Sequence, residues 1–385
     1  MTERTPRRDF LLGHAPTAGK AESGDDSACQ TAGARQVSSP TLNEPYLVHL
    51  SRKAMAGEFE ICLPIAIAGE ATAAALKALD LVQSLEAQLS FFRPDSDISE
   101  INRRAADAAV EVEPRLFALL QTAMQLWRDS GGVYDLTAAP LWEAWGFARR
   151  AGAIPSPEQL AEARALVGGQ WLELDDANKT IRFLRRGVRL NLGSIGKGYA
   201  IDRAVEHLLA AGVADFLVHG GQSSVAARGS AAGPLKTAAA SNRPPAAPAA
   251  RSPWKIGVKD PLRDERRLGQ VELNDRALGT SGAQFQSFRH RGRRYGHILD
   301  PRTGWPADSL LSVTVLAPTA AEADALSTAF YVMGPEAVMS YCRHRPAIAA
   351  ILFSSTASNR WELHHCGLAE ESSDLLAALA SPPAG

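Results

Sequence analysis

Residues 188–202, VRLNLGSIGKGYAID, are the most informative segment of this sequence. An apolar, strand-like run leads into three closely spaced glycines, and a helix is expected from about Tyr199. Glycines allow close approach to the backbone, and the unpaired amides at a helix N-terminus suit a phosphate. The segment is not a P-loop, because that motif would need glycine at Asn191 and a hydroxyl at Gly198. Two interpretations stay open: a phosphate cradle, or a helix packed tightly on a strand.

A second segment is residues 318–334, PTAAEADALSTAFYVMG. Thr319 and Glu322 have the spacing of a helix-capping box, and a Gly-Pro pair follows the apolar run as a stop signal. Inside the predicted helix, Asp324 and Thr328 are four residues apart, so both side-chain oxygens project from one face. A carboxylate beside a hydroxyl is the hard-oxygen chemistry that suits Mg²⁺. A buried Asp–Thr hydrogen bond or a solvated face explains the pair equally well.

The third segment, residues 277–306, combines hydroxyl groups, a basic run and a turn. The arginines between 289 and 294 lie in a predicted hairpin. In a chain of balanced charge, a solvent-exposed hairpin explains these basic residues better than a nucleic-acid-binding surface does. His297 titrates near neutrality and is close to Asp300, so the two are a candidate acid–base pair. The alternative is a turn held by Asp and Thr side chains, with His297 merely hydrogen-bonded.

Helices and strands are mixed in the rest of the chain, which predicts an α+β fold. Helices are expected over 71–90 and 115–128 from their leucine spacing, and from a capping box at Ser156 to about 166. Runs rich in Val, Ile and Leu predict strands at 58–67, 187–192, 214–219, 255–259, 269–274, 311–317 and 347–353. Since only some connections are helical, a purely parallel sheet is not expected.

The composition excludes several classes of partner. Lys plus Arg (41) balance Asp plus Glu (42), so no net field attracts nucleic acid or an anionic membrane. No apolar run approaches the roughly 18 to 20 residues of a membrane-spanning helix. We therefore expect no nucleic-acid partner and no integral membrane segment. The four cysteines form no C-x-x-C pair, which favours buried or incidental thiols over a disulfide framework or a zinc site.

Three stretches have the composition of irregular chain. We expect a disordered N-terminal segment over 1–44, a low-complexity loop over 229–253 and a loose tail over 367–385, around one domain at 45–366. Arg7-Arg8 is typical of a twin-arginine export signal, but the residues that follow are polar rather than apolar. A cytoplasmic protein is the favoured interpretation, and periplasmic export is the alternative.

Taken in order, these segments resemble the FAD:protein FMN transferase (ApbE-like) family from about Met55 to Gly334. The resemblance rests on the colinear order of eight blocks rather than on any one of them. The blocks are SFFRPDSDISEIN (90–102), GGVYDLTAAPLWEAWGF (131–147), LNLGSIGKGYAID (190–202), VHGGQ (218–222), WKIGVKDP (254–261), TSG (280–282), YGHILDPRTGWP (295–306) and ADALSTAFYVMG (323–334). The resemblance implies a T-fold-like architecture in which mixed or antiparallel sheets are packed by helices.

The resemblance also implies an activity: Mg²⁺-dependent transfer of FMN from FAD to a Thr or Ser hydroxyl of a target protein, with release of AMP. By the same resemblance, Asp324 and Thr328 match metal-binding side chains, and Gly196 falls where the family uses a backbone carbonyl. Implied FAD contacts are Met55, Phe92, Tyr134, Asp135, Gly193, Tyr199 and Ile298. An FAD pyrophosphatase and a non-catalytic FAD-binding protein are the alternatives.

The chemistry suggests three further roles. Attack on a pyrophosphate needs an aligned nucleophile and neutralised phosphate oxygens. His297 is the candidate for proton transfer at the incoming hydroxyl, with Asp300 as its orienting partner, and Lys197 would steady phosphate charge.

The chain departs from the family pattern at three positions. Gly57 stands in Met-Ala-Gly where Met-Gly-Thr is usual, and Gln222 replaces an acidic residue. Ala283 follows Thr-Ser-Gly, where the family often has an acidic residue.

Overall fold

A computed structural model describes residues 46–221, 223–233, 252–263, 265–282, 286–356 and 360–368. Several predictions fall outside these residues: the segment 1–44 with Arg7-Arg8, most of the loop 229–253 and of the tail 367–385, and the departures at Gln222 and Ala283.

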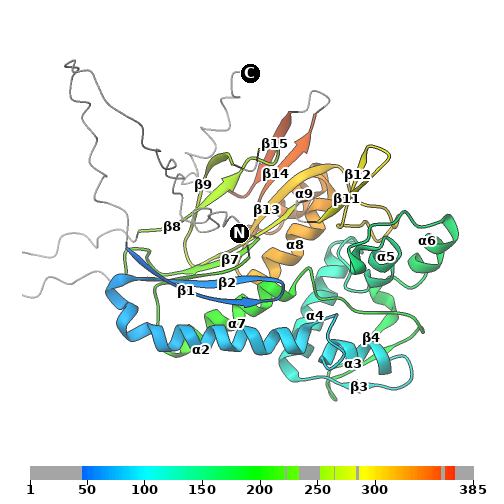
Figure 1. The fold of residues 1–385 in the computed structure, drawn as a ribbon, viewed down its shortest axis with the longest axis horizontal. Coiled ribbons are helices and arrows are strands. Elements are labelled where there is room, and N and C mark those ends of the chain that lie inside the picture. Colours follow the sequence, from blue (N-terminus) through cyan, green and yellow to red (C-terminus); the bar gives the residue numbers. More distant parts are fainter. Residues whose placement is uncertain are drawn as a thin grey trace, which may run out of the picture.

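The centre of the fold is an eight-stranded antiparallel sheet in the order β1-β2-β6-β7-β10-β13-β14-β15 (Figure 1). Its strands are β1 (Leu47–Ala54), β2 (Gly57–Pro64), β6 (Phe216–Gly220), β7 (Ser224–Arg228), β10 (Ala277–Gly282), β13 (Leu310–Ala317), β14 (Ala349–Ser355) and β15 (Trp361–Cys366). Alternate residues of each strand face opposite sides, and both faces are covered, so strands such as β6 are buried throughout.

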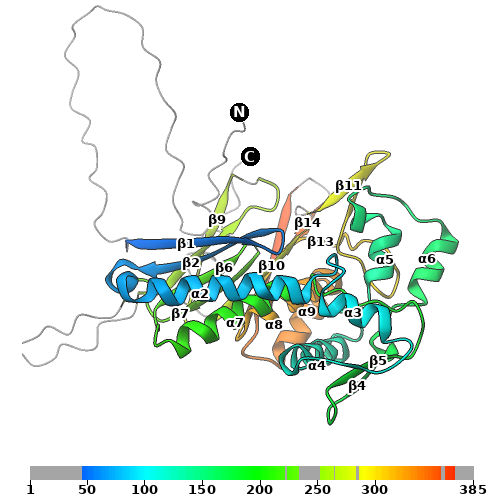
Figure 2. The same cartoon turned by 60° about the horizontal axis from the view of Figure 1, so that its bottom comes forward.

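Three helices cover one face of this sheet: α2 (Ile65–Leu89), α7 (Gly196–Ala210) and α8 (Ala320–Met333). Figure 2 shows α2 lying along β1 and β2, with α7 beside it. Phe59, Ile61 and Leu63 point from β2 into this main core, where alanines of α2 let the helix approach closely. Helix α8 is buried on nearly every side because α7, β10 and β13 surround it.

The hairpin β8 (Trp254–Lys259) and β9 (Arg267–Leu273) covers the opposite face. Its apolar side chains, with Trp254 and Ile256 among them, form a second core with Cys62 and Leu217 of the sheet.

Smaller elements complete the structure. They are α3 (Asp97–Arg104), β3 (Val110–Glu111), α4 (Pro114–Asp129), α5 (Ala139–Ala144), η1 (Phe147–Arg149), α6 (Pro157–Arg164), η2 (Gly169–Trp171), β4 (Leu172–Asp175), β5 (Thr180–Phe183), β11 (Ser287–His290), β12 (Arg293–Gly296) and α9 (Pro335–Arg343). Strands β3, β5 and β4 form a separate sheet, and β11 pairs with β12 in the predicted basic hairpin.

The predicted α+β class is confirmed, and so are most predicted elements. The capping box that joins Ser156 and Gln159 is present, and Thr319 caps α8 through the Glu322 amide. The strand predicted at 187–192 is wrong. There the Asn102 side chain bonds both the amide and the carbonyl of Leu190, at 2.7 and 3.0 Å, in place of a strand partner. No helix of the described residues is long and apolar enough to cross a membrane.

Candidate active site

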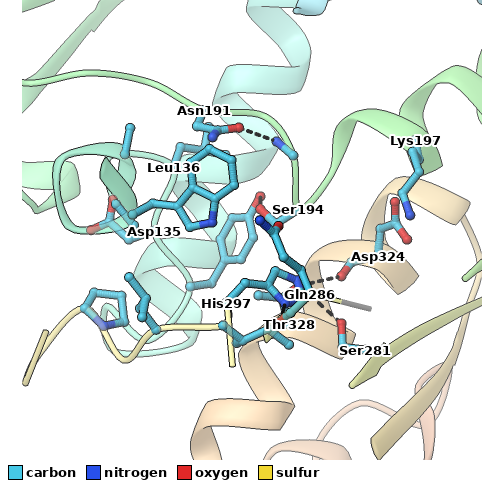
Figure 3. A pocket seen from close by; sticks show the side chains of 18 of the residues that line it. Asp135, Leu136, Asn191, Ser194, Lys197, Ser281, Gln286, His297, Asp324 and Thr328 are labelled. Atoms are coloured by element: carbon cyan, nitrogen blue, oxygen red, sulfur yellow. Dashed lines mark hydrogen bonds between the residues drawn. The ribbon is translucent and has the colours of Figure 1, made fainter. Parts of the chain in front are cut away.

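A cavity of about 380 Å³ opens where the start of α7, the face of α8 that carries Asp324 and Thr328, and the end of β10 meet (Figure 3). The segment 133–142 and the turn 297–301 form its other walls. Nine of the thirteen predicted site residues line it: Phe92, Tyr134, Asp135, Gly193, Lys197, His297, Ile298, Asp324 and Thr328. The sequence blocks that are far apart along the chain therefore converge on one hollow.

Asp324 is the buried carboxylate of this cavity. Its Oδ2 accepts a hydrogen bond from the Gly198 amide at 2.7 Å, and its Oδ1 accepts one from the Ser224 hydroxyl at 2.5 Å. Burial raises the pKa of Asp324, against the opposing effects of Lys197 and the two hydrogen bonds. A cation placed beside this carboxylate would offset the cost of keeping its charge out of water.

Other hydroxyl groups lie on the same wall, next to the backbone carbonyl of Asp324, which accepts hydrogen bonds from Ser327 at 2.9 Å and Thr328 at 3.4 Å. Thr328 lies one turn along α8, and the Ser281 hydroxyl of β10 is 3.4 Å from the Thr328 hydroxyl and 2.8 Å from that of Ser327. Gly196 is not among the residues that line the cavity; it begins α7, beside Lys197. Oxygen donors around a buried carboxylate fit a hard divalent cation such as Mg²⁺.

Lys197 supplies the positive charge of the site. Its ammonium group contacts the Ser223 hydroxyl, which lies 3.3 Å from the hydroxyl of Ser224. Ser224 in turn bonds Asp324, so Lys197 is connected to the carboxylate through two serines. These serines are site residues that the sequence analysis missed. Their signal was a hydroxyl pair directly after the block VHGGQ.

His297 lies on the turn opposite, half-buried, with its Nδ1 3.0 Å from the Gln286 carbonyl oxygen. Because a carbonyl only accepts, Nδ1 carries the proton, and Nε2 of the neutral ring is left as an acceptor. Burial lowers the pKa of His297, and the charge of Lys197 lowers it further, against the effect of the Gln286 bond. The ring is therefore neutral at pH 7 and suited to take a proton.

Asp300 is not brought to His297. Its carboxylate forms a two-pronged ion pair with Arg302, at 3.0 Å and 2.9 Å, and accepts the Arg302 amide as well. The structure instead places Gln286, which the sequence did not single out, as the group that orients His297.

Aromatic side chains form the other end of the cavity. Phe92 is 66% exposed, and its ring centre lies 6.0 Å from that of Trp142. Tyr134 is buried below them, with its hydroxyl 3.5 Å from that of Ser194, and burial raises the pKa of Tyr134. Burial also raises the pKa of Asp135, against the effect of its Thr137 bonds. This end offers flat apolar surface, whereas the Asp324 end offers charge.

Two predicted FAD contacts do not line this cavity. Met55 lies in the turn between β1 and β2 with a φ of 49°, and packs against the main core. Tyr199 is on the buried side of α7, also in the main core. In this structure both positions serve packing.

Comparisons with known proteins identify the family. Residues 55–352 match the model of the ApbE family. The chain is 32% identical over 291 residues to the FAD:protein FMN transferase of Treponema pallidum, covering 74% of this chain and 78% of that protein. It is 30% identical over 265 residues to the protein of the same name from Haemophilus influenzae, covering 66% and 71%.

Solved structures agree. The apo flavinyl transferase ApbE of Pseudomonas stutzeri superposes with a TM-score of 0.71 at 28% identity, covering 86% of this chain and 98% of that one. The ApbE protein of Thermotoga maritima gives a TM-score of 0.70 at 29% identity, covering 82% and 96%. The eight colinear blocks, the cavity they enclose and these matches together show that the chain belongs to the ApbE family.

Proposed function

We propose that this chain transfers FMN from FAD to a Thr or Ser hydroxyl of an acceptor protein and releases AMP. The observation that carries the proposal is the arrangement of Asp324, His297 and Lys197 around one cavity whose far end is aromatic. Curated relatives named FAD:protein FMN transferase support it.

Asp324 and Thr328 would hold a Mg²⁺ ion from α8; Gly196, whose carbonyl the family resemblance implied as a third donor, does not line the cavity. The Ser281 hydroxyl lies beside Thr328 and adds an oxygen to the same wall. Bound there, the ion would neutralise phosphate oxygens and so lower the barrier to attack at phosphorus. The burial of Asp324 supports this assignment, because a bare carboxylate in that position is costly.

His297 would serve as the general base. Its Nε2 accepts the proton of the acceptor hydroxyl while that oxygen attacks the phosphorus of the FMN half of FAD. The bond from this phosphorus to the bridging oxygen breaks, and the electron pair leaves with AMP. Lys197 steadies the negative charge on the phosphate oxygens. The hydrogen bond from Nδ1 to Gln286 holds the imidazole in the tautomer that this step requires.

The aromatic end would hold a ring of the substrate. Phe92 and Trp142 offer edges and faces near the opening of the cavity, and flat aromatic ligands stack on such surfaces. A cavity lined by these aromatic side chains and by Asp324 and Lys197 suits a ligand that combines a planar ring with phosphate.

One assay tests the proposal. The purified chain is incubated with FAD, Mg²⁺ and an acceptor protein that carries a candidate Thr or Ser, and AMP and protein-bound flavin fluorescence are followed on a denaturing gel. AMP release matched by a fluorescent acceptor supports the transfer, and chelation of the metal should stop both. AMP with free FMN would indicate a pyrophosphatase instead, and tight FAD binding without AMP would indicate a flavin-binding protein.

A further inference from the structure

A cluster of metal-binding side chain types lies outside the cavity, near the β1 edge of the sheet. His49 comes from β1, and Glu60 and Cys62 come from β2. His49 and Cys62 are directly opposite each other in the antiparallel ladder, and Glu60 is two residues before Cys62. All three side chains therefore point to the same face, the one that packs on β8 and β9.

The potential ligand atoms converge. His49 Nδ1, a Glu60 carboxylate oxygen and Cys62 Sγ all lie within 4.8 Å of one another. The sulfur is 3.5 Å from His49 Nδ1 and 3.7 Å from Glu60 Oε1, and His49 Nδ1 also contacts Glu60 Oε1. In a tetrahedral site with Zn–S near 2.3 Å and Zn–N or Zn–O near 2.1 Å, such atoms stand about 3.5 Å apart. The two sulfur separations match that geometry, whereas the direct contact between His49 and Glu60 would have to open to admit an ion.

The same contacts exclude a catalytic triad. In a triad the nucleophile and the carboxylate bond different nitrogens of the histidine. Here Cys62 and Glu60 both approach Nδ1 of His49. Cys62 is also only 1% exposed, so no substrate reaches its sulfur. Three donors directed at a common point, one of them a thiol, indicate an ion rather than a reaction.

A second histidine supports the cluster from β6. His219 faces Glu60 across the ladder, with its Nε2 3.7 Å from Glu60 Oε2. Its Nδ1 is 3.2 Å from the Gly221 carbonyl oxygen, which accepts the ring proton, so Nε2 carries a lone pair and does not donate a hydrogen bond to Glu60. His219 therefore adds an unprotonated imidazole nitrogen to the polar groups beside the cluster.

We propose that His49, Glu60 and Cys62 bind a zinc ion that fastens edge strand β1 to β2. On binding, the Cys62 thiol gives up its proton to solvent and the thiolate joins the ion; no oxidation occurs. A thiolate, an imidazole and a carboxylate together suit Zn²⁺ rather than Mg²⁺. None of these residues lines the cavity of the proposed transferase, so the two sites are tested separately. The cysteines were expected to be incidental, because ligands brought together across strands show no zinc spacing in the sequence.

The test uses the full purified chain, stripped of metal and held in excess Mg²⁺ so that the hard-oxygen site is occupied. Co²⁺ is the probe, since a thiolate ligand gives it a strong charge-transfer absorption, and Zn²⁺ should then displace it. We expect one equivalent of Co²⁺ with this absorption, and a higher melting temperature in Zn²⁺. Cys62→Ser should abolish the absorption and weaken zinc binding about 100-fold or more.

The controls separate this cluster from other thiols. Cys366→Ser removes a thiol from β15, at the opposite edge of the sheet, and should leave the absorption and the zinc shift unchanged. His49→Ala, at a half-buried position, provides a second ligand variant if Cys62→Ser misfolds. The proposal is overturned if the wild-type chain gives no thiolate absorption, if the absorption persists in Cys62→Ser, or if Cys366→Ser removes it.

Discussion

The Gly198 amide at the start of α7 donates a 2.7 Å hydrogen bond to the Asp324 carboxylate of α8. The bond joins residues 126 positions apart in the chain. It locks the two helices together at the wall of the cavity, and it holds the carboxylate where the Ser224 hydroxyl also bonds it and the charge of Lys197 acts on it. Packing and chemistry therefore depend on the same side chain.

Asp324→Asn separates these two roles. The amide oxygen can still accept the Gly198 hydrogen bond, but the side chain no longer carries the charge that a divalent cation needs. We expect the fold to survive and kcat/KM for AMP release from FAD to fall by about 100-fold or more. The control is Asp308→Asn, which removes an exposed carboxylate that pairs with Arg293 at 3.0 Å and does not line the cavity. An Asp324→Asn enzyme that works at the parental rate would show that the cation site has been misplaced.

His297→Ala should lower the rate of FMN transfer by about 100-fold or more, with a smaller loss of FAD affinity. Because Asp300 pairs with Arg302 rather than with the imidazole, Asp300→Asn should lower the rate of FMN transfer much less than His297→Ala does. A loss of affinity that exceeds the loss of rate would make His297 a binding group instead.

The dependence of the rate on pH tests the charge that surrounds His297. Burial and Lys197 hold its pKa below the ordinary value of 6.5, so the acidic limb of the rate profile should lie below pH 6.5. Lys197→Met removes the charge that disfavours the imidazolium form, so the limb should move to higher pH, whereas Lys197→Arg should leave it in place. Single-turnover rates between pH 5 and 8 measure the shift, and an unmoved limb in Lys197→Met contradicts the assignment of the limb to His297.

Gly198 is also required for steric reasons. A Cβ at this position would lie 2.1 Å from the carbonyl oxygen of Ala320, which is backbone and cannot rotate away. We expect Gly198→Ala to destabilise the fold by about 3 kcal/mol or more, measured by urea unfolding. The matched control is Gly69→Ala in α2, where a Cβ meets nothing within 4 Å. That change should be neutral or stabilise the chain by up to about 1 kcal/mol. Equal effects of the two substitutions would disprove the steric argument.

The sequence predicted those features that are set by neighbouring residues. The cap at Thr319, the period of α8 and the position of Asp324 on it are all local, and all could be read from residues 318–334. The order of the eight blocks carried the family resemblance, and that resemblance indicated which residues would share a site. The cavity that they line agrees with that expectation for nine residues.

Features that depend on distant partners could not be predicted in this way. The segment 187–192 has strand-like composition, but Asn102 occupies its backbone groups from 88 residues away. Ser224 bonds Asp324 across 100 positions, and the hydroxyl pair after VHGGQ does not indicate which carboxylate it would meet. His297 is oriented by a backbone carbonyl, which any residue type at position 286 would offer. Long-range hydrogen bonds of this kind are set by tertiary packing and produce no periodic pattern in the sequence.

Asp202 supplies a prediction about the dependence of stability on pH. From α7 its two carboxylate oxygens accept the Ala320 and Ala321 amides at the start of α8, at 2.7 and 2.8 Å. Burial nevertheless raises the pKa of Asp202 from its ordinary value of 3.8 to about 6. The folded chain therefore binds more protons than the unfolded chain between about pH 4 and pH 6, and the contribution of Asp202 to stability decreases as the pH rises through that range.

Asp202→Asn should make this contribution visible as a difference between two chains. The asparagine has one carbonyl oxygen for two amides, so the variant should be less stable than the wild type at pH 4. Because the asparagine cannot ionise, the variant does not lose this stability above pH 4. The difference in unfolding free energy between the wild type and the variant should therefore narrow by about 2 kcal/mol by pH 6. Urea unfolding of both chains at pH 4, 5 and 6 measures the gap, and the other carboxyl groups cancel in the difference. A gap that stays constant or widens would mean that Asp202 is ionised in the folded chain throughout this range, with its charge stabilised by the two amides of α8.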